Sequence, residues 1–266
     1  EFFRLFARIE MIWISIWYFD MRTKISAKVF KLEWSINVPR LDKMTSAKSA
    51  QELFQAAYEN RYTWEPIFPG YTAAVQLKQG DEVFTGTISV KSNLSAEVTG
   101  IDNEEARNSI IGQLREVAIH RVRRTFAETH GKNTFSYGET DATGAVEILM
   151  GGKSAGDRYK IRNNEVCHVH RHIHGIMVTI DTFSSHDTGK GYLSHRYDSV
   201  YADPVTGEIK SGKIVFEDNY QQVGGFQILS QRIIQASEEG KPTTTEFNFT
   251  NIELLPDRVE AAAASA

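Results

Sequence analysis

The chain has 266 residues, of which 41% are hydrophobic and 11% aromatic, and its formal net charge is -4. This length predicts one large domain or two small ones, and the apolar content excludes a largely disordered chain. The slightly negative charge argues against a protein that binds nucleic acid through general attraction to phosphates. A single cysteine, Cys167, excludes an internal disulfide framework and fits a reducing compartment.

The two ends of the chain differ in composition from its body. Residues 1–43 crowd aromatic and aliphatic side chains together, but charged residues interrupt them, and no uninterrupted apolar run reaches the roughly 20 residues of a transmembrane helix. We therefore expect no transmembrane segment. An orderly pattern begins at Met44. The expected organisation is a non-native or flexible extension over residues 1–43, one domain over residues 44–258, and a low-complexity tail over residues 259–266.

The body opens with a predicted helix and hairpin. Ser46 can cap a helix that runs to about Asn60, and the following Trp64–Gly70 segment contains two prolines that break it. Residues 71–78 and 83–91 alternate in polarity around a Gly-Asp turn, which predicts two paired strands.

A long helix is predicted from Asp102 to Phe126. Asp102 and Glu105 form a capping box, and apolar residues recur at helical spacing after it. The basic cluster His120–Arg124 falls near its end, where cations complement the helix dipole. We interpret this cluster as a solvated helix end.

From Thr134 to Leu255 the pattern consists of strands and turns. Gly, Asn, Asp or Pro marks each turn, and the regular spacing predicts an antiparallel meander. The fold class expected is α+β: a curved antiparallel β half-barrel of about ten strands, covered by two helices, with a cavity between sheet and helix.

Four histidines stand two residues apart within the segment Val166–His174. They are His168, His170, His172 and His174, half of the eight histidines in the chain. Side chains alternate faces along a strand, so all four imidazoles should point the same way, about 6.6 Å apart between neighbours. This row predicts either a polar face that contacts a ligand or senses pH, or part of a metal site.

A metal site needs ligands from a second element, because four histidines in a straight row cannot all reach one ion. His186 or His195, with Asp187 or Asp198, could supply them. The candidate ligands of a divalent metal, zinc or iron, are His170, His172, His195 and Asp198.

The row is predicted to continue into Ile176, Val178 and Ile180 on the same face of one long strand. In a half-barrel that face would line the cavity from an apolar floor to a polar mouth, which suits an amphiphile. The predicted ligand contacts are His168, His170, Arg171, His172, His174, His195 and Arg196.

Several stretches of the body resemble a family of cyanobacteria and plastids that is catalogued as a domain of unknown function, family 3386. The stretches are residues 50–64, 68–71, 119–124, 133–138, 170–175 and 191–198. The resemblance implies a photosynthetic source and a location in the cytoplasm or the plastid stroma, and it implies no activity. The last hairpin, residues 223–252, is more loosely similar to lipoprotein-carrier-like half-barrels.

Three functions remain open from the sequence. The leading hypothesis is a non-enzymatic carrier of an amphiphilic ligand such as a lipid, isoprenoid or tetrapyrrole, with Arg171 or Arg196 pairing with a carboxylate. The second is a metal-dependent enzyme that uses the strand histidines. The third is an assembly factor that binds proteins of a photosynthetic complex.

Overall fold

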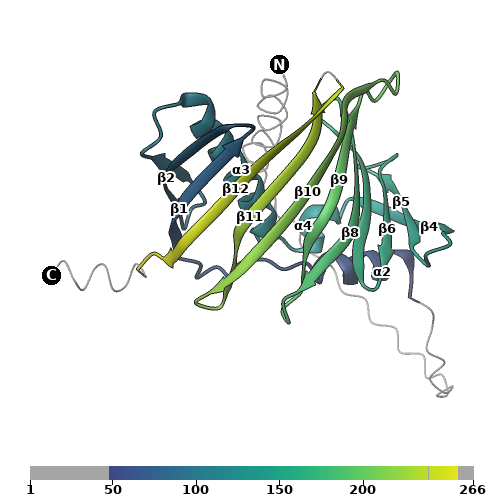
Figure 1. Cartoon of the computed structure of the whole chain (residues 1–266). Helices are drawn as coiled ribbons and strands as arrows, with labels where there is room; N and C mark the ends of the chain where they lie inside the picture. Colours follow the sequence, from purple (N-terminus) through teal and green to yellow (C-terminus); the bar gives the residue numbers. More distant parts are fainter. Residues whose placement is uncertain (1–47, 239, 257–266) are drawn as a thin grey trace, which may run out of the picture.

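The computed structural model describes residues 48–238 and 240–256. The predicted extension over residues 1–43 and the predicted tail over residues 259–266 lie outside this part of the chain. The described residues form one twelve-stranded sheet in the order β3-β2-β1-β12-β11-β10-β9-β8-β7-β6-β5-β4, and all of its pairings are antiparallel (Figure 1).

The elements have the following bounds. The helices are α2 (Ala50–Glu59), α3 (Glu104–Arg121) and α4 (Phe126–His130). The first strands are β1 (Gly70–Gln79), β2 (Glu82–Lys91), β3 (Ala96–Thr99), β4 (Asn133–Thr140), β5 (Val146–Gly152) and β6 (Arg158–Arg162). The remaining strands are β7 (Glu165–Ile173), β8 (Ile176–Asp187), β9 (Tyr192–Ala202), β10 (Ile209–Val223), β11 (Phe226–Glu238) and β12 (Lys241–Leu254).

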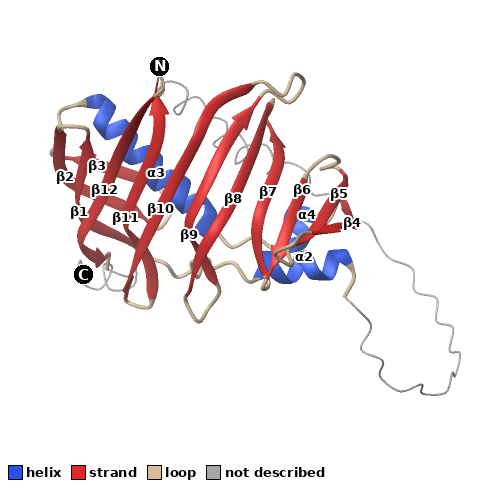
Figure 2. Ribbon diagram, turned by 45° about the vertical axis from the view of Figure 1, so that its right-hand side comes forward, coloured by secondary structure: helices blue, strands red, loops and turns tan. Residues whose placement is uncertain are grey.

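Helix α3 connects the two ends of the sheet. The chain forms β1 to β3 at one edge, crosses one face of the sheet as α3, and resumes with β4 at the opposite edge (Figure 2). From β4 a meander returns strand by strand until β12 pairs with β1. With 18 residues, α3 is about 27 Å long, which is enough to pass behind several strands.

The fold class is as predicted in outline, with two corrections of number. The sheet has twelve strands rather than about ten, and the described residues form three helices rather than two. The helix predicted over residues 102–126 ends at Arg121, after which Val122 is extended (φ -69°, ψ 123°), and a new capping box of Thr125 and Glu128 begins the separate helix α4. The first helix is capped by Ser49 rather than Ser46.

The hydrophobic core separates into two clusters. The larger packs α3 against β1, β2 and β9 to β12, with Ile110, Leu229 and Phe247 among its buried members. The smaller packs α2 and α4 against β5 and β6, around Phe54 and Ile148. The two clusters therefore fill the two ends of one face of the sheet. The region between them is where a binding site could lie.

No helix among residues 48–238 and 240–256 is both long enough and apolar enough to span a bilayer.

Candidate functional site

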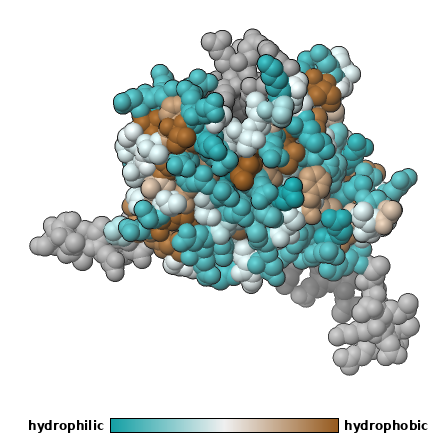
Figure 3. Space-filling model, viewed as in Figure 1, coloured by the Kyte–Doolittle hydropathy of each residue, from teal (hydrophilic) through white to brown (hydrophobic). Residues whose placement is uncertain are grey.

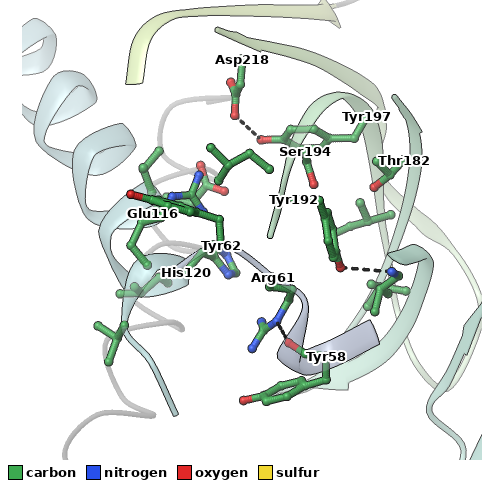
Figure 4. Close-up of a pocket in the computed structure, with 18 of the residues that line it drawn as sticks. Tyr58, Arg61, Tyr62, Glu116, His120, Thr182, Tyr192, Ser194, Tyr197 and Asp218 are labelled. Carbon is green, nitrogen blue, oxygen red and sulfur yellow. Dashed lines mark hydrogen bonds between the residues drawn. The ribbon is translucent and has the colours of Figure 1, made fainter. Parts of the chain in front are cut away.

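A cavity of about 370 Å³ lies between the two core clusters. Helices α2 and α4 and the C-terminal half of α3 contribute to its walls, and strands β6 to β11 line the other side. Figure 4 shows its tyrosines and charged groups converging from these elements. The volume falls within the range of about 300–1,000 Å³ that is common for small-molecule sites.

The part of the wall formed by β7 and β8 is apolar except for Arg171 and Thr182. Its apolar members are Val166, Val169, Ile173, Val178 and Ile180, and Val117 and Ile119 of α3 also line the cavity. The alternation of a strand accounts for the spacing of most of these residues, and a β-bulge at Cys167 brings Val166 and Val169 to the same face.

Arg61 reaches the cavity from the segment that follows α2. This segment is held against β9 by two backbone bonds: Tyr62 N–H donates to Tyr192 O and Tyr192 N–H donates to Asn60 O, both at 2.9 Å. The Arg61 Nε–H donates to Tyr58 O at 2.9 Å, and the guanidinium lies 3.9 Å from the centre of the Tyr58 ring (Figure 4). The cation is thus placed by backbone and aromatic contacts.

Arg121 ends α3 inside the cavity. Only 8% of it is exposed, and its Nη2–H donates to the hydroxyl of Tyr220 at 3.1 Å. Its Nε is buried and has no hydrogen-bond acceptor among the described residues. The basic cluster that we interpreted as a solvated helix end therefore places one of its arginines in the interior.

Arg171 of β7 enters the cavity between Val169 and Ile173. Its Nε lies 3.6 Å from Asp157 Oδ2, beyond hydrogen-bond distance, and this Nε is also buried without an acceptor in the part of the chain that the structure describes.

Arg232 joins the sheet to α3 at the far end of the cavity. Its guanidinium donates to both carboxylate oxygens of Asp218, at 2.7 and 2.6 Å, to Gln113 Oε1 at 2.8 Å and to Glu116 Oε2. It also donates to the hydroxyl of Tyr197 at 3.0 Å. Burial alone would lower the pKa of Arg232, but the two carboxylates outweigh burial and raise its pKa well above the usual value.

Burial favours the neutral form of four tyrosines and one histidine that line the cavity. Burial raises the pKa of Tyr159 and of Tyr192 to about 12 and raises the pKa of Tyr197 and Tyr220. Burial, reinforced by the charges of nearby arginines, lowers the pKa of His130 to about 4. At neutral pH the cavity therefore combines neutral tyrosines and histidine with permanently charged guanidinium groups.

The histidine row lies on the opposite face of the sheet from the cavity. His174 (φ 48°) and Gly175 (φ 79°) form a two-residue turn of the type I′ kind, so β7 and β8 are separate strands of a hairpin. Register pairs His168 with Asp181 and His170 with Thr179, whereas Arg171 pairs with Val178. Directly paired residues share a face, so the predicted continuation of the row into Ile176, Val178 and Ile180 was wrong.

Side-chain contacts agree with this placement. His168 Nδ1 lies 2.7 Å from Asp181 Oδ1, His170 Nδ1 lies 3.0 Å from Thr179 Oγ1, and His172 N–H donates to Asp157 Oδ1. His174 is exposed in the turn. Figure 3 shows the face of the sheet turned away from α3, and hydrophilic residues dominate it. Among the predicted ligand contacts on β7, Arg171 is the one that lines the cavity.

The structure does not bring the predicted metal ligands together. His170 and His172 have ring centroids 6.0 Å apart. His195 Nδ1 contacts Ser184 Oγ at 3.0 Å, and Asp198 is paired with Lys213 at 2.6 Å. Within residues 48–238 and 240–256, no three histidine, cysteine, aspartate or glutamate side chains are close enough to hold one ion.

The residues of β8 and β9 that were predicted to supply metal or ligand contacts interact with other side chains. The rings of His186 and His195 lie 4.5 Å apart, and Arg196 pairs with Glu217 at 3.5 Å. Neither His195 nor Arg196 lines the cavity.

The sequence prediction missed most of the polar cavity residues. They are Arg61, Tyr62, Glu116, Arg121, Tyr192, Tyr197, Asp218, Tyr220 and Arg232. One signal was present: the cluster His120–Arg124 ends a helix whose apolar stripe faces the sheet, so at least one of its side chains had to turn inward.

Fold and site together define a class of protein: an open antiparallel sheet that holds a mixed apolar and cationic cavity against a crossing helix. The chain belongs to the family described as Protein of unknown function (DUF3386), whose model matches residues 45–255.

Three solved chains are similar to this chain, and two of them are bacterial proteins with the following likeness. A LolA superfamily protein from Nitrosomonas europaea has 9% sequence identity and a TM-score of 0.34, with 80% of this chain and 97% of that chain covered. A domain described as an outer membrane lipoprotein-sorting protein, from Vibrio parahaemolyticus, has 8% identity and a TM-score of 0.27, with 81% and 97% covered. At such TM-scores these likenesses carry no argument about function. No curated protein sequence matches the chain.

Proposed function

We propose that the protein is a binding or carrier protein for an amphiphilic ligand, such as a lipid, an isoprenoid or a tetrapyrrole. The observation that carries the proposal is the cavity between the two core clusters, which has an apolar wall on β7 and β8 and a polar wall at the end of α3. Protein interiors are normally close-packed, so a space of about 370 Å³ at the centre of the fold is best explained by a ligand.

The composition of the lining favours binding over catalysis. Valine and isoleucine side chains offer dispersion contacts and apolar surface, which suits an alkyl or polyisoprenyl chain. The tyrosine hydroxyls and guanidinium groups supply hydrogen bonds at one end. We find no nucleophile with an activating base among the residues that line the cavity.

The experiment is a titration of the whole protein with a neutral fluorescent amphiphile, for example a dansyl-labelled fatty amide. Ile180→Trp adds bulk to a side chain that lines the cavity, and Met177→Trp makes a matched change on the same strand at a residue outside the lining. We expect saturable binding that Ile180→Trp weakens about tenfold or more and Met177→Trp leaves unchanged. Absence of saturable binding, or equal effects of the two variants, would contradict the proposal.

The proposal includes the cellular location of the protein. The resemblance of the sequence to proteins of cyanobacteria and plastids supports a site of action in the cyanobacterial cytoplasm or the plastid stroma. Fractionation of cells that express the tagged full-length protein would test it, and recovery in a periplasmic or lumenal fraction would contradict it.

A further inference from the structure

We infer that the cavity contains a subsite for an oxyanion, so that the amphiphile it binds carries a carboxylate or phosphate head held by Arg61, Arg121 and Arg171. This inference rests on the proposed function and specifies the chemical class of its ligand.

The charge of the lining is strongly unbalanced. Five arginines line the cavity, Arg61, Arg121, Arg124, Arg171 and Arg232, against two carboxylates, Glu116 and Asp218. Both carboxylates are bound to Arg232. Arg61 and Arg121 therefore have no carboxylate partner among the lining residues, and the carboxylate near Arg171 is that of Asp157, outside the lining, at 3.6 Å.

Two of these guanidinium groups have buried nitrogens that lack an acceptor. Arg121 is 8% exposed, and Tyr220 accepts from its Nη2, but its Nε has no acceptor among the described residues. The Nε of Arg171 is also buried without a hydrogen-bond acceptor among the described residues, because Asp157 Oδ2 is 3.6 Å away. A buried, charged donor without an acceptor is unfavourable, and an oxyanion in the cavity would satisfy it.

Arg61 completes the subsite from a different element. Its Nε–H donates to Tyr58 O and its guanidinium lies over the Tyr58 ring, so its terminal nitrogens are not used by these contacts (Figure 4). Guanidinium groups bind carboxylate and phosphate through parallel hydrogen bonds, and Arg61, Arg121 and Arg171 line the same cavity from the α2–β1 segment, α3 and β7.

The apolar wall sets the orientation of the ligand. Arg171 stands between Val169 and Ile173 on β7 and is paired with Val178 on β8. An alkyl chain that extends from a head group at Arg171 would therefore lie along these aliphatic side chains. Head and chain sites are contiguous on one strand, which is the arrangement a single-chain amphiphile requires.

The experiment compares dodecanoate, dodecyl phosphate and dodecanol, which share one chain and differ in the head. Affinities are measured on the full-length protein by displacement of the neutral fluorescent probe. We expect at least one of the two anions to bind about tenfold or more tightly than dodecanol, because each charge-assisted bond adds to the affinity. The anion that binds more tightly identifies the head group as carboxylate or phosphate.

Arg121→Gln and Arg61→Gln are the test variants, and Arg158→Gln, an exposed arginine of β6 outside the cavity, is the matched control. We expect each test variant to lose most of the preference for the anion, measured as the ratio of the affinities for the anion and for dodecanol. Circular dichroism of each variant reports whether the fold is intact. The control should keep the preference.

The outcomes separate the two proposals. Equal affinities of the unaltered protein for the anions and dodecanol would overturn the anion subsite and leave the amphiphile site standing. An anion preference that survives in both test variants would also overturn the subsite. Failure of all three compounds and of the neutral probe to bind would overturn the proposed function itself.

Discussion

Arg232 of β11 and Asp218 of β10 form a two-point ion pair inside the protein. The Arg232 Nε to Asp218 Oδ1 distance is 2.7 Å, the Nη2 to Oδ2 distance is 2.6 Å, and each residue is only 2% exposed. The same guanidinium donates to Gln113 and Glu116 of α3. One side chain thus connects the sheet to the helix that crosses it, and both elements wall the cavity.

Arg232→Met should be strongly destabilising. The change leaves the buried carboxylate of Asp218 without its cation, and the loss of one partner of a buried pair typically costs about 3–5 kcal/mol. Urea unfolding followed by circular dichroism measures the free energy of unfolding. Arg158→Met, on the exposed surface of β6, is the control and should stay within about 0.5 kcal/mol of the unaltered protein. A loss below about 1 kcal/mol for Arg232→Met would show that the pair does not hold helix and sheet together.

Gly191 fixes the segment that carries Arg61. Its φ is +116°, and a Cβ built on it would lie 2.5 Å from Asn60 O and 2.9 Å from Tyr62 N. Gly191→Ala should therefore lower the unfolding free energy by about 1–3 kcal/mol and weaken amphiphile binding, since Arg61 would be displaced. Gly189→Ala is a useful comparison because Gly189 also has positive φ (+73°) but nothing lies within 4 Å of its Cβ. Equal losses for the two variants would mean that backbone strain alone, and not the close approach of the Arg61 segment, explains the effect.

Replacing His170 and His172 together by alanine should leave ligand affinity unchanged. Both side chains lie on the face of β7 opposite Arg171, outside the cavity lining. Probe titration and metal analysis of the purified double variant provide the measurement, with Arg171→Gln as the comparison that should weaken anion binding. If the double variant lost affinity as Arg171→Gln does, the assignment of faces on β7 would be wrong.

The sequence predicted the sheet well because each strand carries a local signal. The Gly-Asp, Asn-Asn and Gly-Gly turns and the two-residue alternation each depend on only a few neighbouring residues, so the antiparallel meander could be predicted from them. The predicted strand count, about ten, was lower than the twelve strands of the sheet.

Which face of a strand is inward is a harder question. A two-residue turn at His174 and Gly175 and a bulge at Cys167 each change the face assignment, and neither is visible in a pattern that reads as continuous alternation. The arginines that line the cavity are even harder to predict from the sequence. Arg61, Arg121 and Arg232 are far apart in sequence, and they line one cavity only because the fold brings the α2–β1 segment, α3 and β11 together.

His130 should make the stability of the protein depend on pH. It is 5% exposed among Phe54, Tyr58 and Phe126, its Nδ1 is in hydrogen-bond contact with Asn133 Nδ2, and burial lowers its pKa to about 4. The unfolded chain, with a pKa near 6.5, binds the proton first as pH falls, so the folded state loses stability between about pH 6.5 and 4 and the loss levels off below that. The full contribution is on the order of 3 kcal/mol.

His130→Phe removes this titration while it keeps an aromatic ring in the cluster. Unfolding free energies of the unaltered protein and the variant, measured from pH 7 to pH 4, share the titration of the carboxylates, so their difference isolates His130. We expect the unaltered protein to lose on the order of 3 kcal/mol more than the variant over this range. Parallel curves would mean that His130 titrates at its ordinary pKa in the folded protein.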